Sequence, residues 1–157
     1  MNEHHYLLPF ASDYMEGTHP AILKKMMEIN HTPMPGYGAD TISHRAAEKI
    51  LAACHAPEGE VHFLIGGTQT NATVIDAILA SYQGVIAADT GHISVHEAGA
   101  IEFGGHKVLP LPHKLGKLSP DQIDAYLKKF EHDGPRDHMV MPGMVYSSHP
   151  TDYGTVY

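Results

Sequence analysis

Cysteine is nearly missing from this sequence, because Cys54 is the only one in 157 residues. An internal disulfide is therefore excluded, which agrees with a reducing compartment. Basic residues are also scarce: ten Lys and Arg stand against eighteen Asp and Glu, the net charge is −8, and no basic stripe is visible. Nucleic acid is thus not an expected partner.

Long apolar runs and targeting signals are missing as well. No run approaches the roughly 20 apolar residues that span a bilayer, and the opening MNEHH lacks the basic and apolar regions of a signal peptide. We expect no membrane partner and a cytoplasmic protein. What is present, 43% apolar and 18% charged residues, is typical of a globular chain long enough for one domain with a core.

Strand-like and helix-like segments alternate along the chain, which predicts an α/β fold with a mainly parallel sheet flanked by helices. Cys54 falls on the apolar side of its helix, so we expect it in the core. The expected strands are 61–65, 85–88, 107–111 and 139–147. The expected helices run from residue 20, from 41 to 54, from about 71 to 81 and from 120, and the third of them should bury Val74, Ile75, Ile78 and Leu79.

The segment Gly66-Gly67-Thr68-Gln69-Thr70-Asn71 stands between an expected strand and an expected helix. Glycines let the backbone approach a ligand closely, and the free N–H groups at a helix N-terminus favour an anion. The segment is neither a Walker loop nor a GxGxxG fingerprint. Two interpretations stay open here: a phosphate-binding turn that connects strand to helix, or a plain tight turn with a threonine cap.

The segment from Asp89 to Glu97 follows the second expected strand, at the edge of the sheet where α/β proteins bind ligands. If it is helical, His92 and His96 lie one turn apart on the same face, and Glu97 points about 100° away from His96. The pair could ligate a metal, face solvent, or face an aromatic cofactor with His92 as a proton acceptor. Because H-E-x-x-H is missing, we expect no metal ligand here.

Four segments in the same order resemble the threonine aldolase and β-eliminating lyase family. They are Phe10-Ala11-Ser12-Asp13, Pro35-Gly36-Tyr37-Gly38-Ala39-Asp40, Gly66 to Asn71, and Ala88 to Ala100 with its HI…EAGA pattern. The resemblance implies part of a fold type I (aminotransferase-like) large domain, pyridoxal 5'-phosphate as cofactor, an amino acid as the small-molecule substrate, and a homo-oligomer, dimer or tetramer.

The same resemblance assigns roles to single residues. Gly67, Thr68 and Gln69 would hold the phosphate, His92 would stack on the pyridine ring and act as a base, His96 and Glu97 would lie near the substrate as further catalytic residues, Ser12 would bind the substrate carboxylate, and Tyr37 would reach a neighbouring subunit's site. The implied reaction cleaves a β-hydroxy-α-amino acid to glycine and an aldehyde, or is a related β-elimination.

One feature departs from the family pattern: no lysine matches the motif of the lysine that anchors the cofactor. We therefore expect residues 1–157 to be the N-terminal part of the cofactor-binding domain, inactive alone, with the remainder in a longer product or in a complementing C-terminal chain. Two alternatives stay open, namely a non-catalytic truncated remnant that acts as an interaction domain and a histidine-dependent metal hydrolase.

Overall fold

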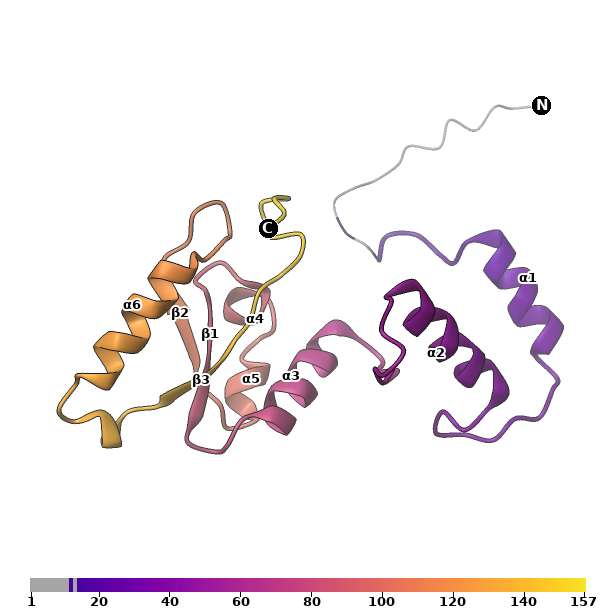
Figure 1. Cartoon of the computed structure of the whole chain (residues 1–157). Coiled ribbons are helices and arrows are strands. Elements are labelled where there is room, and N and C mark those ends of the chain that lie inside the picture. The colour runs from indigo at the N-terminus through magenta and orange to yellow at the C-terminus, as the bar shows by residue number, and fades with distance from the viewer. Residues whose placement is uncertain (1–11, 13) are drawn as a thin grey trace, which may run out of the picture. The chain divides into compact units, whose positions relative to one another are not determined.

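The computed structural model describes Ser12 and residues 14–157 (Figure 1). The chain divides into two compact units, Met1–Val61 and His62–Tyr157. Part of the expected Phe10 to Asp13 motif therefore lies outside the described residues.

The first unit contains the helices α1 (Pro20–Ile29) and α2 (Thr41–Ala53). His19 caps α1 through Nδ1, which accepts from the Ala21 N–H at 3.2 Å, and Pro20 occupies the first turn. Asp40 caps α2 by accepting from the backbone N–H groups of Ile42 and Ser43 at 2.9 and 2.8 Å. Both predicted helices are confirmed, and local capping explains where each begins.

Neither of these two helices buries a residue, although each carries an apolar stripe. Cys54 is exposed, so the prediction that it packs in the core is wrong. An apolar side of a helix is buried only where another element covers it, and no residue of α2 is buried. The unpaired thiol is thus at the surface of this unit.

The second unit is built on a parallel sheet of three strands, β1 (Gln83–Ala88), β2 (Val108–Leu111) and β3 (Met141–Val145), in the order β2-β1-β3. The register pairs Val85 with Val108, and Gln83 with Met141. Helices α3 (Gly67–Ile78), α4 (His92–Val95) and α5 (Ala100–Phe103) lie on one side of the strands, and α6 (Pro120–Glu131) lies on the other (Figure 1). A short 3-10 helix, η1 (Arg136–His138), precedes β3. The predicted α/β class with a parallel sheet is confirmed.

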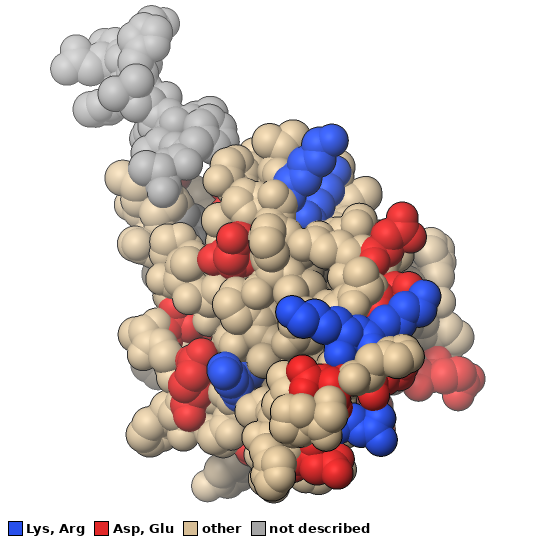
Figure 2. All heavy atoms as spheres, turned by 90° about the vertical axis from the view of Figure 1, so that its left-hand side faces the viewer, with Lys and Arg blue, Asp and Glu red and all other residues tan. Residues whose placement is uncertain are grey.

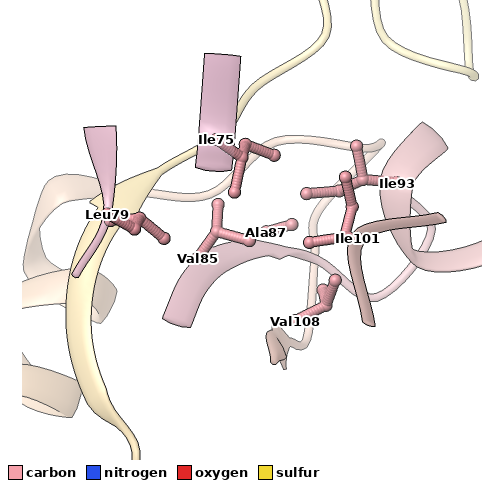
Figure 3. Close-up of a cluster of buried hydrophobic side chains, with 7 residues drawn as sticks. All are labelled: Ile75, Leu79, Val85, Ala87, Ile93, Ile101 and Val108. Atoms are coloured by element: carbon pink, nitrogen blue, oxygen red, sulfur yellow. The ribbon is translucent and has the colours of Figure 1, made fainter. Parts of the chain in front are cut away.

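Side chains of β1 alternate between two hydrophobic clusters, as the pleat of a strand requires. Val85 and Ala87 meet α3, α4 and α5 in one cluster (Figure 3), whereas Ile86 and Ala88 meet the α6 side. The first cluster comprises Ile75, Leu79, Val85, Ala87, Ile93, Ile101 and Val108. The second comprises Ile86, Ala88, Leu109, Leu111 and Leu118. Against it pack Ile123, Tyr126 and Leu127 of α6, and Val140, which directly precedes β3.

Three details that the sequence predicts for this part of the chain are wrong. Residues 61–65 form no strand, and Phe63 and Ile65 are exposed, because none of the described strands pairs with this segment. α3 begins at Gly67, so the glycine-rich segment is itself the first turn of the helix. Only Ile75 and Leu79 of the expected four residues are buried, while Val74 and Ile78 face outward.

The outer face of α6 carries charges of both signs. Lys128 Nζ lies 2.6 Å from Asp124 Oδ2, one helical turn away. Figure 2 shows basic and acidic side chains interspersed on the face of the molecule that it presents. Among the described residues, no helix combines the length and the apolar character needed to cross a membrane.

Candidate active site

The N-terminus of α3 offers three backbone donors. Gly66 is the N-cap residue, with φ −160° and ψ 164° and no side-chain cap. The first intrahelical bond runs from the Thr70 N–H to the Gly66 carbonyl at 2.9 Å. The N–H groups of Gly67, Thr68 and Gln69 precede that bond, so they point out of the helix end and add to its positive dipole.

This helix end is open to a ligand. A Cβ added to Gly66 or Gly67 would meet no atom within 4 Å, and residues 66–69 are exposed. The amide oxygen of Gln69 is already engaged, because Oε1 accepts from the Ile65 N–H at 3.1 Å. A helix start thus lies within this segment, earlier than predicted and without the predicted strand before it, and it offers the backbone N–H groups of Gly67, Thr68 and Gln69 as donors.

His92 begins α4 directly beyond the carboxyl end of β1. The short helix is held in place by Ile93, which is buried, and by Ser94, whose Oγ donates to the Ala88 carbonyl at 2.9 Å. The His92 side chain remains 45% exposed. The His96 ring lies with its centroid 5.5 Å from that of His92 and is tilted by 53°, so these two histidines are neighbours as the spacing predicts.

Glu97 is buried and turns back toward His92 rather than away from it. Its side chain has no exposed surface, and its Oε1 lies 2.8 Å from His92 Nδ1. The same oxygen accepts from Asn71 Nδ2 at 2.6 Å. Its other oxygen, Oε2, is buried without a hydrogen-bond partner. Glu97 therefore connects α3 with the segment that carries His92.

Three further polar side chains extend the group formed by Glu97 and His92, namely those of Asn71, Tyr146 and Ser148. The sequence alone does not predict a role for any of them. Tyr146 OH lies 3.5 Å from Asn71 Nδ2 and accepts from Ser148 Oγ at 3.4 Å, both long distances for hydrogen bonds. Asn71 lies 26 positions before Glu97 and 75 before Tyr146. No spacing rule reaches that far, so only the fold can bring these residues together.

A second pair of titratable side chains lies at the same edge of the sheet. His113 Nδ1 is 2.6 Å from Asp89 Oδ1, and the His113 ring packs on Tyr153 with centroids 5.1 Å apart. Asp89 follows β1 and His113 follows β2, so the parallel topology places both at the carboxyl edge.

The remaining expected site residues belong to the first unit. The Ser12 hydroxyl accepts from the Tyr14 N–H at 3.4 Å. Tyr37 is fully exposed in a turn with positive φ, as expected for a loop that its own chain leaves uncovered. The substrate role of Ser12 and the intersubunit role of Tyr37 stay predictions. Among the described residues, no three His, Cys, Asp or Glu side chains gather to hold a metal ion.

The fold and this site define a class: the chain belongs to the β-eliminating lyase family, whose model matches residues 9–154. Within that class it is similar to threonine aldolases. It is 34% identical to the low specificity L-threonine aldolase of Pseudomonas aeruginosa over 151 residues, which are 94% of this chain and 42% of that protein. The corresponding enzyme of a Pseudomonas species (strain NCIMB 10558) is 32% identical over the same shares.

A solved structure gives the same picture. The threonine aldolase of Leishmania major matches with a TM-score of 0.86 and 43% identity, over 92% of this chain and 41% of that chain. The chain thus spans about two fifths of the length of the relatives that it matches.

Proposed function

We propose that this chain supplies the phosphate-binding turn and the general base of a pyridoxal 5'-phosphate-dependent lyase. The reaction is the cleavage of a β-hydroxy-α-amino acid to glycine and an aldehyde. One observation carries the proposal: a hydrogen bond from Asn71 to Glu97, and a second one between Glu97 and His92, join the open end of α3 to an exposed imidazole. The names of the relatives, L-threonine aldolases, support this reaction type.

The residues present fit the cofactor. A phosphate group suits the N–H groups of Gly67, Thr68 and Gln69 because an open helix N-terminus favours an anion. The exposed ring of His92 is a flat surface for an aromatic ring. When bound, the cofactor takes up the electron pair that the breaking Cα–Cβ bond leaves on Cα.

His92 performs the proton transfer in this proposal. Its Nδ1 is engaged by the Glu97 carboxylate at 2.8 Å, which leaves Nε2 to receive the proton of the substrate's β-hydroxyl group. Removal of that proton lets the oxygen form the aldehyde carbonyl as the Cα–Cβ bond breaks. His96, whose ring neighbours that of His92, lies on the substrate side in our proposal.

We place the lysine that anchors the cofactor in the part of the enzyme that corresponds to the unmatched three fifths of the relatives. We also propose a cytoplasmic homo-oligomer, dimer or tetramer. Its support is Tyr37, which is fully exposed at the tip of its loop and would be covered by a second subunit. Sedimentation of the native protein tests the oligomer, and a monomer at every concentration would contradict it.

The test of the reaction uses the complete native protein that carries this sequence, supplied with pyridoxal 5'-phosphate. Aldehyde released from L-threonine and L-allo-threonine is measured by coupling to alcohol dehydrogenase and NADH. The His92→Phe variant should keep the cofactor but lose rate by roughly 10²–10⁴-fold, the scale of general acid–base catalysis, while His92→Asn should bind the cofactor less tightly. Absence of turnover in a cofactor-loaded preparation, with the Pseudomonas aeruginosa enzyme active beside it, would overturn the proposal.

A further inference from the structure

We infer that Glu97 and Asn71 are positioning residues that hold His92 in one tautomer, with the proton on Nδ1 and Nε2 free to accept a proton. The catalytic use of that tautomer rests on the function proposed above, whereas the tautomer itself does not. Glu97 is thereby removed from direct contact with substrate, because its side chain has no exposed surface. It acts through His92.

The hydrogen-bond pattern around Glu97 Oε1 fixes the direction of each bond. Asn71 reaches this oxygen with its amide nitrogen at 2.6 Å, so Oε1 is the acceptor. The opposite amide orientation would place two acceptor oxygens at that distance, which is repulsive. His92 Nδ1 lies 2.8 Å from the same oxygen. Since Oε1 accepts, the imidazole must donate from Nδ1.

The other carboxylate oxygen supports this assignment. Glu97 Oε2 is buried and has no hydrogen-bond partner. A proton on Oε2 would be a buried donor without an acceptor, which native proteins avoid. A proton on Oε1 would make that oxygen a poor acceptor for the Asn71 amide, which lies 2.6 Å away. The geometry at Oε1 is therefore that of an acceptor, and a carboxylate only accepts hydrogen bonds.

His96 and Tyr146, two further groups close to this site, do not bond to His92 Nδ1. His96 meets the His92 ring at a centroid distance of 5.5 Å, which is a ring contact rather than a hydrogen bond. Tyr146 OH lies 3.5 Å from Asn71 Nδ2, so it contacts the asparagine and not the His92 ring. A histidine whose Nδ1 is held by a buried carboxylate has a defined ring orientation and tautomer, the arrangement known from histidines that have an orienting partner.

The test measures the tautomer of His92 directly, in the complete native protein without cofactor. Long-range ¹H–¹⁵N spectra of protein labelled at histidine report which ring nitrogen carries the proton in the neutral imidazole, and the His92→Gln variant assigns the signal. We expect Nδ1 to be protonated and Nε2 bare. The reverse pattern in the wild-type spectrum would overturn the inference without any variant being needed.

Two substitutions separate positioning from mere packing. Glu97→Gln keeps an acceptor oxygen and should keep the Nδ1–H tautomer, whereas Glu97→Leu fills the space without an acceptor and should lose it. Asn71→Ala should shift the population in the same direction as Glu97→Leu. The matched control is Glu102→Gln, an exposed acid on α5, which should leave the spectrum unchanged. An unchanged tautomer in Glu97→Leu would contradict the role of Glu97.

Turnover then tests the catalytic use of the tautomer. In the enzyme assay, Glu97→Leu should lower kcat by roughly 10–100-fold, the scale found for orienting partners of functional histidines, with KM changed far less. A full kcat in a variant that has lost the Nδ1–H tautomer would show that the tautomer has no catalytic role. A wild-type protein with no lyase activity but with His92 protonated on Nδ1 would overturn the proposed function alone.

Discussion

Replacing Gly67 with proline removes one proposed hydrogen-bond donor to the phosphate. It breaks no hydrogen bond that the structure contains among the described residues. Proline lacks a backbone N–H, and it is tolerated in the first turn of a helix because that N–H has no intrahelical partner. The residue before it, Gly66, has ψ 164°, which is the extended conformation that proline requires of its predecessor. A Cβ at Gly67 meets no atom within 4 Å. The fold should therefore accept Gly67→Pro.

The expected loss of affinity follows from one charge-assisted hydrogen bond. Such a bond contributes about 1.5–3 kcal/mol, and every 1.4 kcal/mol changes a dissociation constant tenfold. Gly67→Pro should thus weaken phosphate binding by roughly 10- to 150-fold. Gly67→Ala is the matched control, since it keeps the N–H. The free energy of unfolding of both variants should equal that of the wild type or exceed it by up to about 1 kcal/mol, because each substitution replaces a flexible glycine.

Equilibrium dialysis with pyridoxal 5'-phosphate measures this difference, with inorganic phosphate as a second ligand and pyridoxal, which lacks the phosphate, as the negative control. Binding of pyridoxal should be the same in both variants. If Gly67→Pro binds pyridoxal 5'-phosphate as tightly as Gly67→Ala does, the N-terminus of α3 does not hold the phosphate, and the reasoning from the free N–H groups is wrong.

Three further predictions concern stability, each measured by urea or thermal unfolding of the whole chain. Gly84→Ala should cost about 1–3 kcal/mol by overpacking, since its Cβ would lie 2.6 Å from a backbone carbonyl oxygen, whereas Gly134→Ala has open space and should be near neutral. Ile75→Ala should cost about 2–5 kcal/mol, because Ile75 is 2% exposed. Hydrogen bonds from Ser43 hold the pKa of the Asp40 carboxyl below its ordinary value. A carboxyl group whose pKa is lowered by folding stabilises the fold at every pH above its pKa in the unfolded chain. That stabilisation is lost as the pH falls through the pKa of the folded state. Asp40→Ala should therefore weaken α2 at neutral pH, and its difference from wild type should shrink in acid; a difference independent of pH would count against this.

Elements that depend on local signals were predictable from the sequence. α6 begins at Pro120 with Ser119 as its cap, and the Ser119 hydroxyl accepts from the Gln122 N–H at 3.2 Å, as the order of these residue types indicates. β1 is a short apolar run between turns and is almost wholly buried. The expected strand over 61–65 has the same apolar character but no partner among the described strands. Apolar character marks a segment that is able to be buried, and pairing decides whether it becomes a strand.

The direction of Glu97 was not predictable by helix geometry, because the helix that carries His92 is too short. α4 ends at Val95, and the chain then turns through Ala98 and Gly99, which both have positive φ, at 52° and 73°. The rule of about 100° per residue applies only while a helix continues. Once the chain leaves α4, Glu97 is free to face His92, and its contact with Asn71, 26 residues away, depends on tertiary packing.

The packing of the hydrophobic core determines the position of His92, the proposed base. Asn71 and Ile75 are one turn apart on α3 and so project from the same side of the helix. Ile75 packs into the cluster around β1 (Figure 3), which directs Asn71 toward the carboxyl edge of the sheet. Glu97 lies between Ile93 and Ile101 in the chain, and the side chains of both isoleucines are buried. Because packing holds both sides of the contact from Asn71 to Glu97, the carboxylate has a fixed position. The His92 ring is then oriented by that carboxylate rather than by contacts with solvent.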